Sequence, residues 1–246
     1  MSRSPLDVAA APPGPISRTL IRLLMKEARI TAVERLGRHA RLLTLESEEF
    51  RGVDWQPGNK LQVAMGSAFV ARTYTPLHWD ADSGRTQLLG FSHGRGPGSA
   101  WLLGATVGDR CHVFGPRPAL EPRRAGEACV LVGDETSIAL AVALARHGAA
   151  PQQCLFEVDD AAGASTVLAS LGLQAVELRA RQQQDAHLPA MEARLCSLAD
   201  AAATGFVLTG KAGTIQRLQR ALKAHGVPSA RIAAKLHWAP GRTGMD

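Results

Sequence analysis

Four consecutive residues, Arg72-Thr73-Tyr74-Thr75, have the chemistry to bind a flavin. They end a predicted strand just before Pro76. Alternate side chains of a strand share a face, so Arg72 and Tyr74 point the same way and Thr75 turns to the other side. The guanidinium suits a phosphate, the phenol ring suits the flavin body, and Thr75 suits the N5 edge. An arginine in a surface ion pair beside a core tyrosine would give the same pattern, and these four residues alone do not decide.

A glycine-rich stretch follows at residues 93–101, with the sequence HGRGPGSAW, which opens on His93. Gly98 would let a diphosphate approach the backbone closely. Ser99 would cap a short helix, whose N-terminal amides offer an anion site. An ordinary loop could look the same, but a basic strand end followed by a glycine turn and a helix favours nucleotide binding.

The third candidate lies at residues 133–137, where a fully apolar run ends and the next helix begins. Its residues are Gly133, Asp134, Glu135, Thr136 and Ser137. Such a position is at the carboxyl edge of a sheet, where α/β proteins bind ligands. The segment lacks G-x-G-x-x-G, which disfavours a tight dinucleotide site and leaves a loose nicotinamide site open. The alternative is an acidic helix N-terminus stabilised by the helix dipole.

Short strands are predicted throughout the first half of the chain. They lie at 25–35, 39–46, 60–65, 70–75, 86–92 and 110–115, and one short helix is predicted at 99–103. Glycine and proline separate these strands. Six strands in about ninety residues predict a closed antiparallel barrel.

The pattern changes to alternating strands and helices after residue 122. Strands are predicted at 128–132, 153–158, 174–179, 205–209 and 231–238, and helices at 137–146, 165–171, 188–198 and 214–224. This alternation is typical of βαβ units around a parallel sheet. We therefore predict a flexible tail over 1–16, a six-stranded β-barrel over 17–122 and an α/β domain over 123–246.

The charge of the chain is uneven. Of its 28 basic and 22 acidic residues, 17 and 11 lie in residues 1–125, so the whole excess of six is in the first half. An anionic ligand is therefore expected there. The sequence has no apolar run near the ~18 residues of a membrane span, no nucleic-acid module, and no metal-site spacing among its cysteines. We expect a soluble, cytoplasmic, monomeric protein without a resident metal, a membrane or a nucleic-acid partner.

Six motifs in order resemble the siderophore-interacting protein family, the flavin-dependent ferric-siderophore reductases of the ferredoxin-reductase superfamily. The motifs are R-x-Y-T, H-G-x-G-P-G-S-x-W, G-D-R-C-H-V-F-G-P-R, V-G-D-E-T, F-E-V-D-D and W-A-P-G. The similarity runs from about residue 25 to 246. It implies an FAD-binding barrel followed by an NAD(P)H-binding α/β domain.

The resemblance also implies which residues bind the cofactors. For FAD they are Arg72, Tyr74, Thr75, His93, Gly98, Ser99 and Trp238, with Trp238 beside the flavin ring; for the nicotinamide nucleotide they are Gly133, Asp134, Glu135, Thr136, Ser137 and Glu157. Glu157 would lie near the adenosine ribose. Together with Asp159 and Asp160 it would repel a 2′-phosphate, which favours NADH over NADPH.

The implied activity is NAD(P)H-dependent reduction of a ferric siderophore through FAD, which releases iron as Fe(II) in the cytoplasm. No side chain need act as acid, base or nucleophile, and Thr75 would only position N5. Catecholate siderophores are anionic, and Lys60, Arg117 and Arg242 are the candidates to attract them. Two alternatives stay open: a flavin reductase serving another acceptor, and a non-catalytic binder of siderophore or nucleotide.

Three positions depart from the family pattern. Leu77 stands where relatives often have a second arginine after R-x-Y-T-x, His237 replaces a tyrosine before Trp238, and Gly210-Lys211 replaces Gly-Glu. We expect these changes to leave the fold intact and to bear on FAD affinity, cofactor preference and substrate range.

Overall fold

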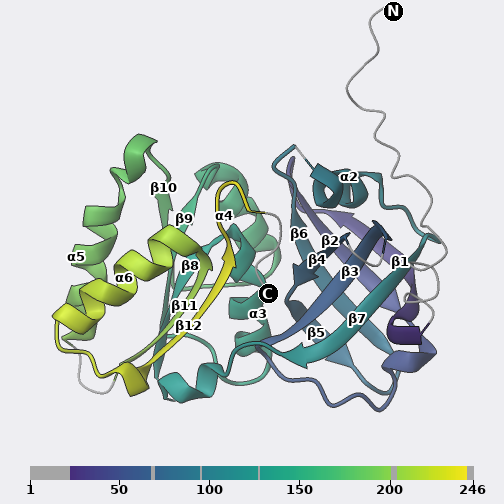
Figure 1. Ribbon diagram of the computed structural model, residues 1–246, viewed down its shortest axis with the longest axis horizontal. Helices are drawn as coiled ribbons and strands as arrows, with labels where there is room; N and C mark the ends of the chain where they lie inside the picture. Colours follow the sequence, from purple (N-terminus) through teal and green to yellow (C-terminus); the bar gives the residue numbers. More distant parts are fainter. Residues whose placement is uncertain (1–22, 68–69, 95, 127, 201–203, 243–246) are drawn as a thin grey trace, which may run out of the picture.

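The computed structural model describes residues 23–67, 70–94, 96–126, 128–200 and 204–242. Its strands form two sheets, one from each half of the chain, that lie side by side (Figure 1). All strand pairs of the first sheet are antiparallel. All strand pairs of the second sheet are parallel. The predicted two-part architecture is therefore confirmed.

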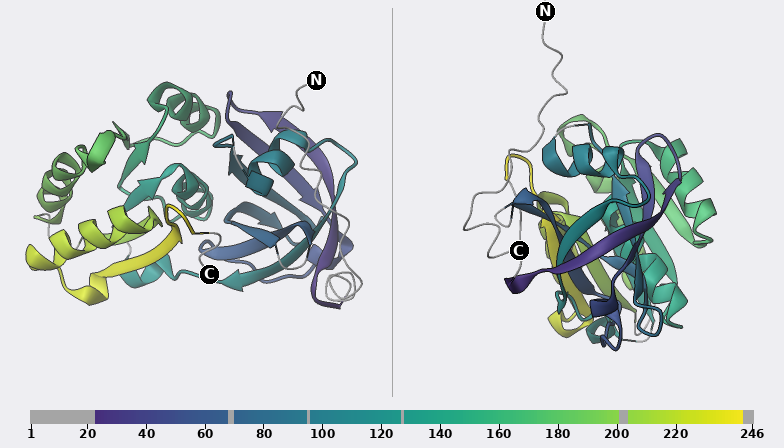
Figure 2. Two further views of the ribbon diagram at one scale, coloured as in Figure 1. Left: turned by 45° about the horizontal axis from the view of Figure 1, so that its top comes forward. Right: turned by 90° about the vertical axis from the view of Figure 1, so that its right-hand side faces the viewer.

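The first sheet has the strand order β4-β3-β7-β1-β2-β6-β5. Its strands are β1 Lys26–Arg35, β2 Ala40–Glu46, β3 Asn59–Ser67, β4 Val70–Tyr74, β5 Pro76–Asp80, β6 Arg85–Phe91 and β7 Arg110–Pro118. The edge strands β4 and β5 are separated in the chain by Thr75 alone, so the two edges meet and the sheet curls into a barrel (Figure 2). Leu61, Val63 and Met65 are alternate residues of β3, and their side chains are buried inside the barrel.

The predicted count of six strands is wrong, because β5 makes a seventh. Its sequence, PLHWD, begins with the proline that the prediction used to end the preceding strand. Proline is tolerated as the first residue of an edge strand, where its missing N–H leaves no ladder bond unmade. Leu77 and Trp79 then face the core while His78 is exposed, which is ordinary strand alternation.

The second sheet has the order β10-β9-β8-β11-β12. Its strands are β8 Cys129–Asp134, β9 Gln153–Val158, β10 Val176–Ala180, β11 Gly205–Lys211 and β12 Ile232–Trp238. Every residue of β8 is buried, because helices cover both faces of this central strand. Because all strand pairs of this sheet are parallel, the carboxyl ends of the five strands meet at one edge.

Two helices cover each face of the second sheet. The helices are α3 Ile138–Arg146, α4 Ala161–Ser170, α5 Leu188–Ala199 and α6 Ala212–Ala224. Val130 and Val132 of β8 pack with α5 and α6, whereas Cys129 and Leu131 pack with α3 and α4. Helix α4 begins four residues earlier than predicted, because the Asp160 side chain accepts a hydrogen bond from Gly163 N (2.9 Å) and caps it there.

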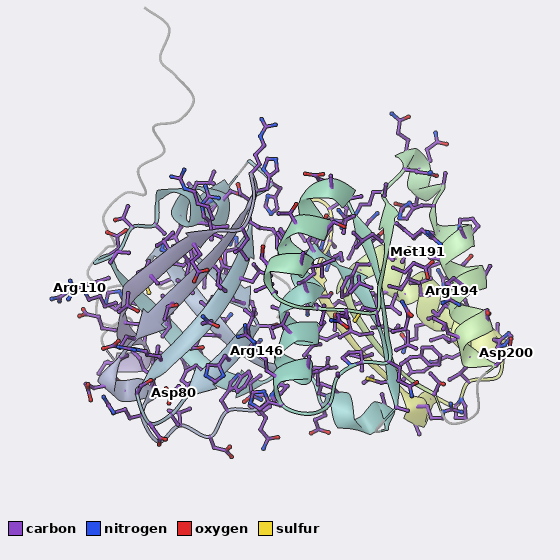
Figure 3. All side chains as sticks on the ribbon, turned by 180° about the vertical axis from the view of Figure 1, so that it is seen from behind. Asp80, Arg110, Arg146, Met191, Arg194 and Asp200 are labelled. Carbon is purple, nitrogen blue, oxygen red and sulfur yellow. The ribbon has the colours of Figure 1, made fainter. Side chains whose placement is uncertain are left out.

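Helix α3 joins the two halves. Its residues share one apolar core with Leu77 of β5 and Leu89 of β6. Arg146, at the end of α3, donates to Gln87 Oε1 of β6 (2.8 Å), and Figure 3 labels this arginine where the helix meets the barrel. The two sheets are thus held together by burial as well as by the chain connection.

The predicted domain limits at 17–122 and 123–246 stay a prediction. The last strand of the barrel ends at Pro118, and the first strand of the second sheet begins at Cys129. The predicted tail, 1–16, lies outside the described residues. No helix in the described part of the chain combines the length and apolar character needed to span a membrane.

Candidate functional site

Arg72 and Gly98, which come from two separate motifs, lie against each other. Arg72 is the middle residue of β4, and Gly98 is in the first turn of α2, Gly96–Gly104. A Cβ on Gly98 would lie only 2.9 Å from Arg72 Cγ, so the arginine stem occupies the space that a side chain would need. The Arg72 guanidinium, which donates from Nη1 to Ala71 O (2.8 Å), is thereby held beside the start of a helix.

The loop before α2 presents an open backbone. Gly94 and Gly96 have φ of 77° and 84°, a conformation that favours glycine, and a Cβ on either would meet no atom within 4 Å. The first amides of an α-helix have no partner within the helix, so those of α2 can bind an anion. Positive guanidinium and helix N-terminus together suit a diphosphate.

The prediction that Ser99 caps α2 is wrong. The helix begins at Gly96, because Pro97 fits its first turn, and this places Ser99 inside the helix. Ser99 is buried, and its Oγ lies 3.4 Å from Nδ1 of the exposed His93. This contact ties the strand side of the loop to the helix and sets the shape of the glycine segment between them.

Tyr74 forms an aromatic pair with Trp101 of α2, with ring centroids 5.9 Å apart. Burial raises the pKa of the Tyr74 phenol above its usual range, and the positive charge of Arg72 offsets this only in part. The phenol is therefore neutral at any physiological pH and can donate a hydrogen bond. Thr75 is the single residue between β4 and β5, at the point where the edges of the barrel meet.

These residues fit an FAD molecule. The open glycine backbone and Arg72 can take the diphosphate, and the neutral Tyr74 and Thr75 can take the ring side. Leu77 does not take part, since it is fully buried and packs in the core shared with α3. An arginine at this position would lie in that apolar core, where its guanidinium could not reach solvent.

Residues 133–137 form a compact turn at the carboxyl end of β8. A Cβ on Gly133 would lie 2.2 Å from Ser137 Oγ and 2.5 Å from Thr209 O, so only glycine fits. Ser137 Oγ donates to Thr209 O (3.0 Å) and is buried. Thr136 is exposed. The turn is therefore locked to the neighbouring strand β11.

Asp134 points into the protein and not toward the solvent. Its carboxylate is fully buried and accepts hydrogen bonds from Thr136 N (2.8 Å), Lys211 N (2.8 Å) and Trp238 Nε1 (2.7 Å). Burial raises the pKa of Asp134, whereas the bonds from Thr136 and Trp238 and the charge of Arg181 lower it. The predicted contact between this side chain and a nucleotide would require breaking these bonds.

Arg181 lies between the acidic residues Glu135 and Asp159 at the carboxyl edge of the second sheet, and no sequence pattern predicted it. Its guanidinium binds Glu135 Oε1 (3.1 Å), Glu135 Oε2 (2.7 Å) and Asp159 Oδ1 (2.8 Å). Burial raises the pKa of Glu135, and Arg181 offsets part of that effect. Arg181 follows β10 directly, and no local pattern distinguishes it from the other arginines of the chain. Asp160, the third predicted acidic residue, is occupied in capping α4.

Glu157 is also turned inward. It is fully buried, and its two oxygens lie 2.7 Å from His187 Nε2 and 2.8 Å from Thr214 Oγ1. Its carboxylate is thus occupied within the protein, and its role near the adenosine ribose stays a prediction. The exposed acidic residue beyond it, Asp159, is the better placed of the two for a ligand hydroxyl.

The three predicted substrate residues lie on different elements. Lys60 of β3 and Arg117 of β7 are paired across the two strands. The Arg117 guanidinium lies over the Phe114 ring (4.2 Å to its centroid) and donates to Gln62. Arg242 is exposed after the end of β12, with its N–H bound to Ala239 O (3.2 Å).

The two candidate sites adjoin. The 3-10 turn η3, Glu135–Ser137, contacts β6, and β6 leads directly into the glycine loop before α2. The open anion site of the barrel and the carboxyl edge of the second sheet therefore border the same region. Ligands bound at these two sites could meet there.

Comparison with known proteins agrees with this geometry. Residues 14–120 match the family model described as the siderophore-interacting FAD-binding domain. A search of curated protein sequences finds no match. Since the matched range contains the Arg72 strand end and the glycine loop, FAD is the cofactor of the barrel.

Solved structures show the same fold over most of the chain. The siderophore-interacting protein of Aeromonas hydrophila is 19% identical, with a TM-score of 0.70 over 89% of this chain and 93% of that one. A siderophore utilization protein from T. fusca is 20% identical, with a TM-score of 0.64 over 90% and 95%. Phthalate dioxygenase reductase is 17% identical, with a TM-score of 0.68 over 86% and 68%. Residues 14–120 thus belong to the siderophore-interacting FAD-binding domain family, and the chain has the ferredoxin-reductase-like two-domain fold.

Proposed function

We propose that the protein is an NAD(P)H-dependent ferric-siderophore reductase. The observation that carries the proposal is the packing of Arg72 on Gly98, which holds a guanidinium beside an open helix N-terminus inside a siderophore-interacting FAD-binding domain. The adjoining carboxyl edge of a parallel sheet is where α/β folds bind nucleotides. The proposal places the reaction in the cytoplasm, where reduced pyridine nucleotides are available.

The residues of the chain bind and orient, and no side chain transfers a proton in the reaction. Arg72 and the amides of α2 would hold the diphosphate, and Thr75 would position the ring beside Tyr74. When bound, FAD supplies the conversion between a two-electron hydride donor and one-electron acceptors. One NAD(P)H reduces two ferric chelates and yields NAD(P)⁺, one proton and two Fe(II). Hard oxygen donors hold Fe(II) more weakly than Fe(III), so reduction releases the iron.

NADH is the proposed donor in preference to NADPH. Asp159 is exposed at the carboxyl edge, and Arg181 is already bound to both Asp159 and Glu135. The Asp159 carboxylate would repel a 2′-phosphate, and Arg181 is not free to neutralise that phosphate.

A comparison of electron acceptors tests the choice of substrate. FAD-loaded protein is supplied with NADH and, in separate assays, with a ferric catecholate, a ferric hydroxamate and free FMN. We expect a higher kcat/KM for at least one ferric chelate than for FMN. A strong preference for FMN would instead identify a flavin reductase, and FAD binding with no turnover of any acceptor would identify a binder.

Reversing the charge of Arg117 is expected to slow reduction of an anionic chelate. Arg117→Glu should lower the second-order rate about 3- to 10-fold at low salt and flatten its dependence on ionic strength, because long-range attraction is screened by salt. Arg117→Gln separates loss of charge from loss of the Gln62 contact. Rates are measured between low and physiological salt.

Arg110→Glu is the matched control for this prediction. Arg110 is on the same strand, is exposed, and pairs with Glu27 (3.0 Å). Figure 3 shows it on the side of the barrel away from the second domain. An equal slowing in Arg110→Glu, or no change in Arg117→Glu, would remove Arg117 from the substrate path.

A further inference from the structure

The Asp134 carboxylate joins the ends of three strands. It is the last residue of β8, and its Oδ2 accepts from Lys211 N at the end of β11 (2.8 Å) and from Trp238 Nε1 at the end of β12 (2.7 Å). Its Oδ1 accepts from both N and Oγ1 of Thr136 (2.8 and 2.5 Å). Each oxygen thus receives two hydrogen bonds, which is the full capacity of a buried carboxylate.

Gly210 allows this arrangement. A Cβ at this position would lie 2.5 Å from Asp134 Oδ2, and φ of Gly210 is 121°, which favours glycine. The backbone of β11 can therefore approach the carboxylate closely enough for the next residue, Lys211, to donate its N–H. The strand end is shaped to surround Asp134.

The Trp238 ring is held at its edge and on one face. Asp134 binds the indole N–H, and the Arg181 guanidinium lies over the ring, 5.7 Å from its centroid. Arg181 is itself fixed by Glu135 and Asp159. A half-buried indole with both constraints has little freedom to turn.

His237 adds a third link through Thr136. Thr136 Oγ1 donates its single proton to Asp134, so it accepts from His237 Nδ1 (2.9 Å), which fixes the tautomer of that imidazole. Burial, together with the charge of Lys235, lowers the pKa of His237 to about 4. The imidazole is therefore neutral near pH 7, and the link does not change over the physiological range.

This network stands beside the junction of the two halves. The turn η3, which contains Thr136, contacts β6 of the FAD-binding barrel. We propose that Asp134 is a positioning residue that fixes the Trp238 indole as a wall of the nicotinamide-binding site, between the carboxyl edge of the sheet and the barrel. This inference rests on the proposed function, and it replaces the predicted direct contact between Asp134 and the nucleotide.

Two substitutions and their combination test the inference. Asp134→Asn keeps the shape but presents an amide N–H₂ to one pair of donors, and Trp238→Phe keeps an aromatic ring without the indole N–H. We expect each to weaken NADH binding to the oxidised, FAD-loaded protein about tenfold, as for loss of a hydrogen bond to a charged group. The double variant should be no weaker than either single variant, because both changes remove the same contact.

A spectroscopic measurement reports on the contact itself. The chain has four tryptophans, so its amide–nitrogen NMR spectrum contains four indole N–H peaks, and the Trp238 peak is the one lost in Trp238→Phe. We expect Asp134→Asn to move that peak upfield and to speed its exchange with solvent. Asp80→Asn is the control: Asp80 accepts three hydrogen bonds from Asp82 and Ser83, and it lies on the barrel away from this network (Figure 3).

The outcomes separate a positioning role from a structural one. Additive losses in the double variant, or an Asp134→Asn protein with reduced stability and unchanged NADH affinity, would overturn the proposal. If Asp134→Asn does not fold, unchanged NADH affinity in Trp238→Phe overturns it. If the unaltered protein binds neither NADH nor NADPH, the proposed function fails, and the wall role of Trp238 fails with it; the indole peak still shows whether Asp134 holds the ring.

Discussion

Replacing Arg72 by alanine is expected to weaken FAD binding about 10- to 150-fold. The change removes a charge-assisted hydrogen bond to the diphosphate, for which about 1.5 to 3 kcal/mol is typical, and 1.4 kcal/mol corresponds to a factor of ten. It also removes the stem that packs on Gly98, so the loop loses part of its support. The measurement is a titration of FAD-free protein with FAD, followed by flavin fluorescence.

Arg85→Ala is the matched control for Arg72→Ala. Arg85 is an exposed arginine of the same barrel, at the opposite end of β6 from the glycine loop, where it pairs with Glu46 (2.6 Å). Its loss should leave the dissociation constant of FAD unchanged. An Arg72→Ala protein that binds FAD as tightly as the unaltered one would contradict the assigned site.

Introducing the arginine that relatives often have, by Leu77→Arg, is expected to destabilise the protein and not to tighten FAD binding. Leu77 is fully buried against residues of α3, so the guanidinium would lose its hydration without gaining a partner. A buried, unpaired charge costs about 3 to 5 kcal/mol of unfolding free energy. Urea denaturation of the FAD-free variants measures this loss.

Leu77→Met supplies the comparison for this second prediction. Methionine conserves volume and polarity, and such exchanges usually cost less than about 1.5 kcal/mol. We therefore expect a nearly normal unfolding midpoint in Leu77→Met and a much lower one in Leu77→Arg. If Leu77→Arg is as stable as the unaltered protein and binds FAD more tightly, this position faces the diphosphate, and the core described here is wrong.

Much of the fold could be predicted because local patterns agree with the final packing. The apolar run that became β8 is buried on both faces, and the predicted order of parallel strands and helices is confirmed. The missed strand β5 shows the limit of such patterns. A leading proline normally ends a strand, and only the edge position in the assembled sheet makes it acceptable.

The buried contacts of Asp134 and Glu157 could not be predicted, because they join distant parts of the chain. Glu157 meets His187 and Thr214, which lie 30 and 57 residues away in sequence. Asp134 meets Trp238 across 104 residues. A strand-end acidic residue predicts proximity to the ligand edge, but whether its side chain turns outward or inward depends on partners that spacing alone does not reveal.

The most direct test of the whole account is an anaerobic stopped-flow record of the flavin absorbance band. FAD-loaded protein is mixed first with NADH or NADPH and then with a ferric chelate. We expect the band to bleach, faster with NADH, and to return when the chelate is added, with two Fe(II) formed per flavin. A band that pyridine nucleotide does not bleach, or a reduced flavin that no ferric chelate reoxidises, would contradict the proposed reductase.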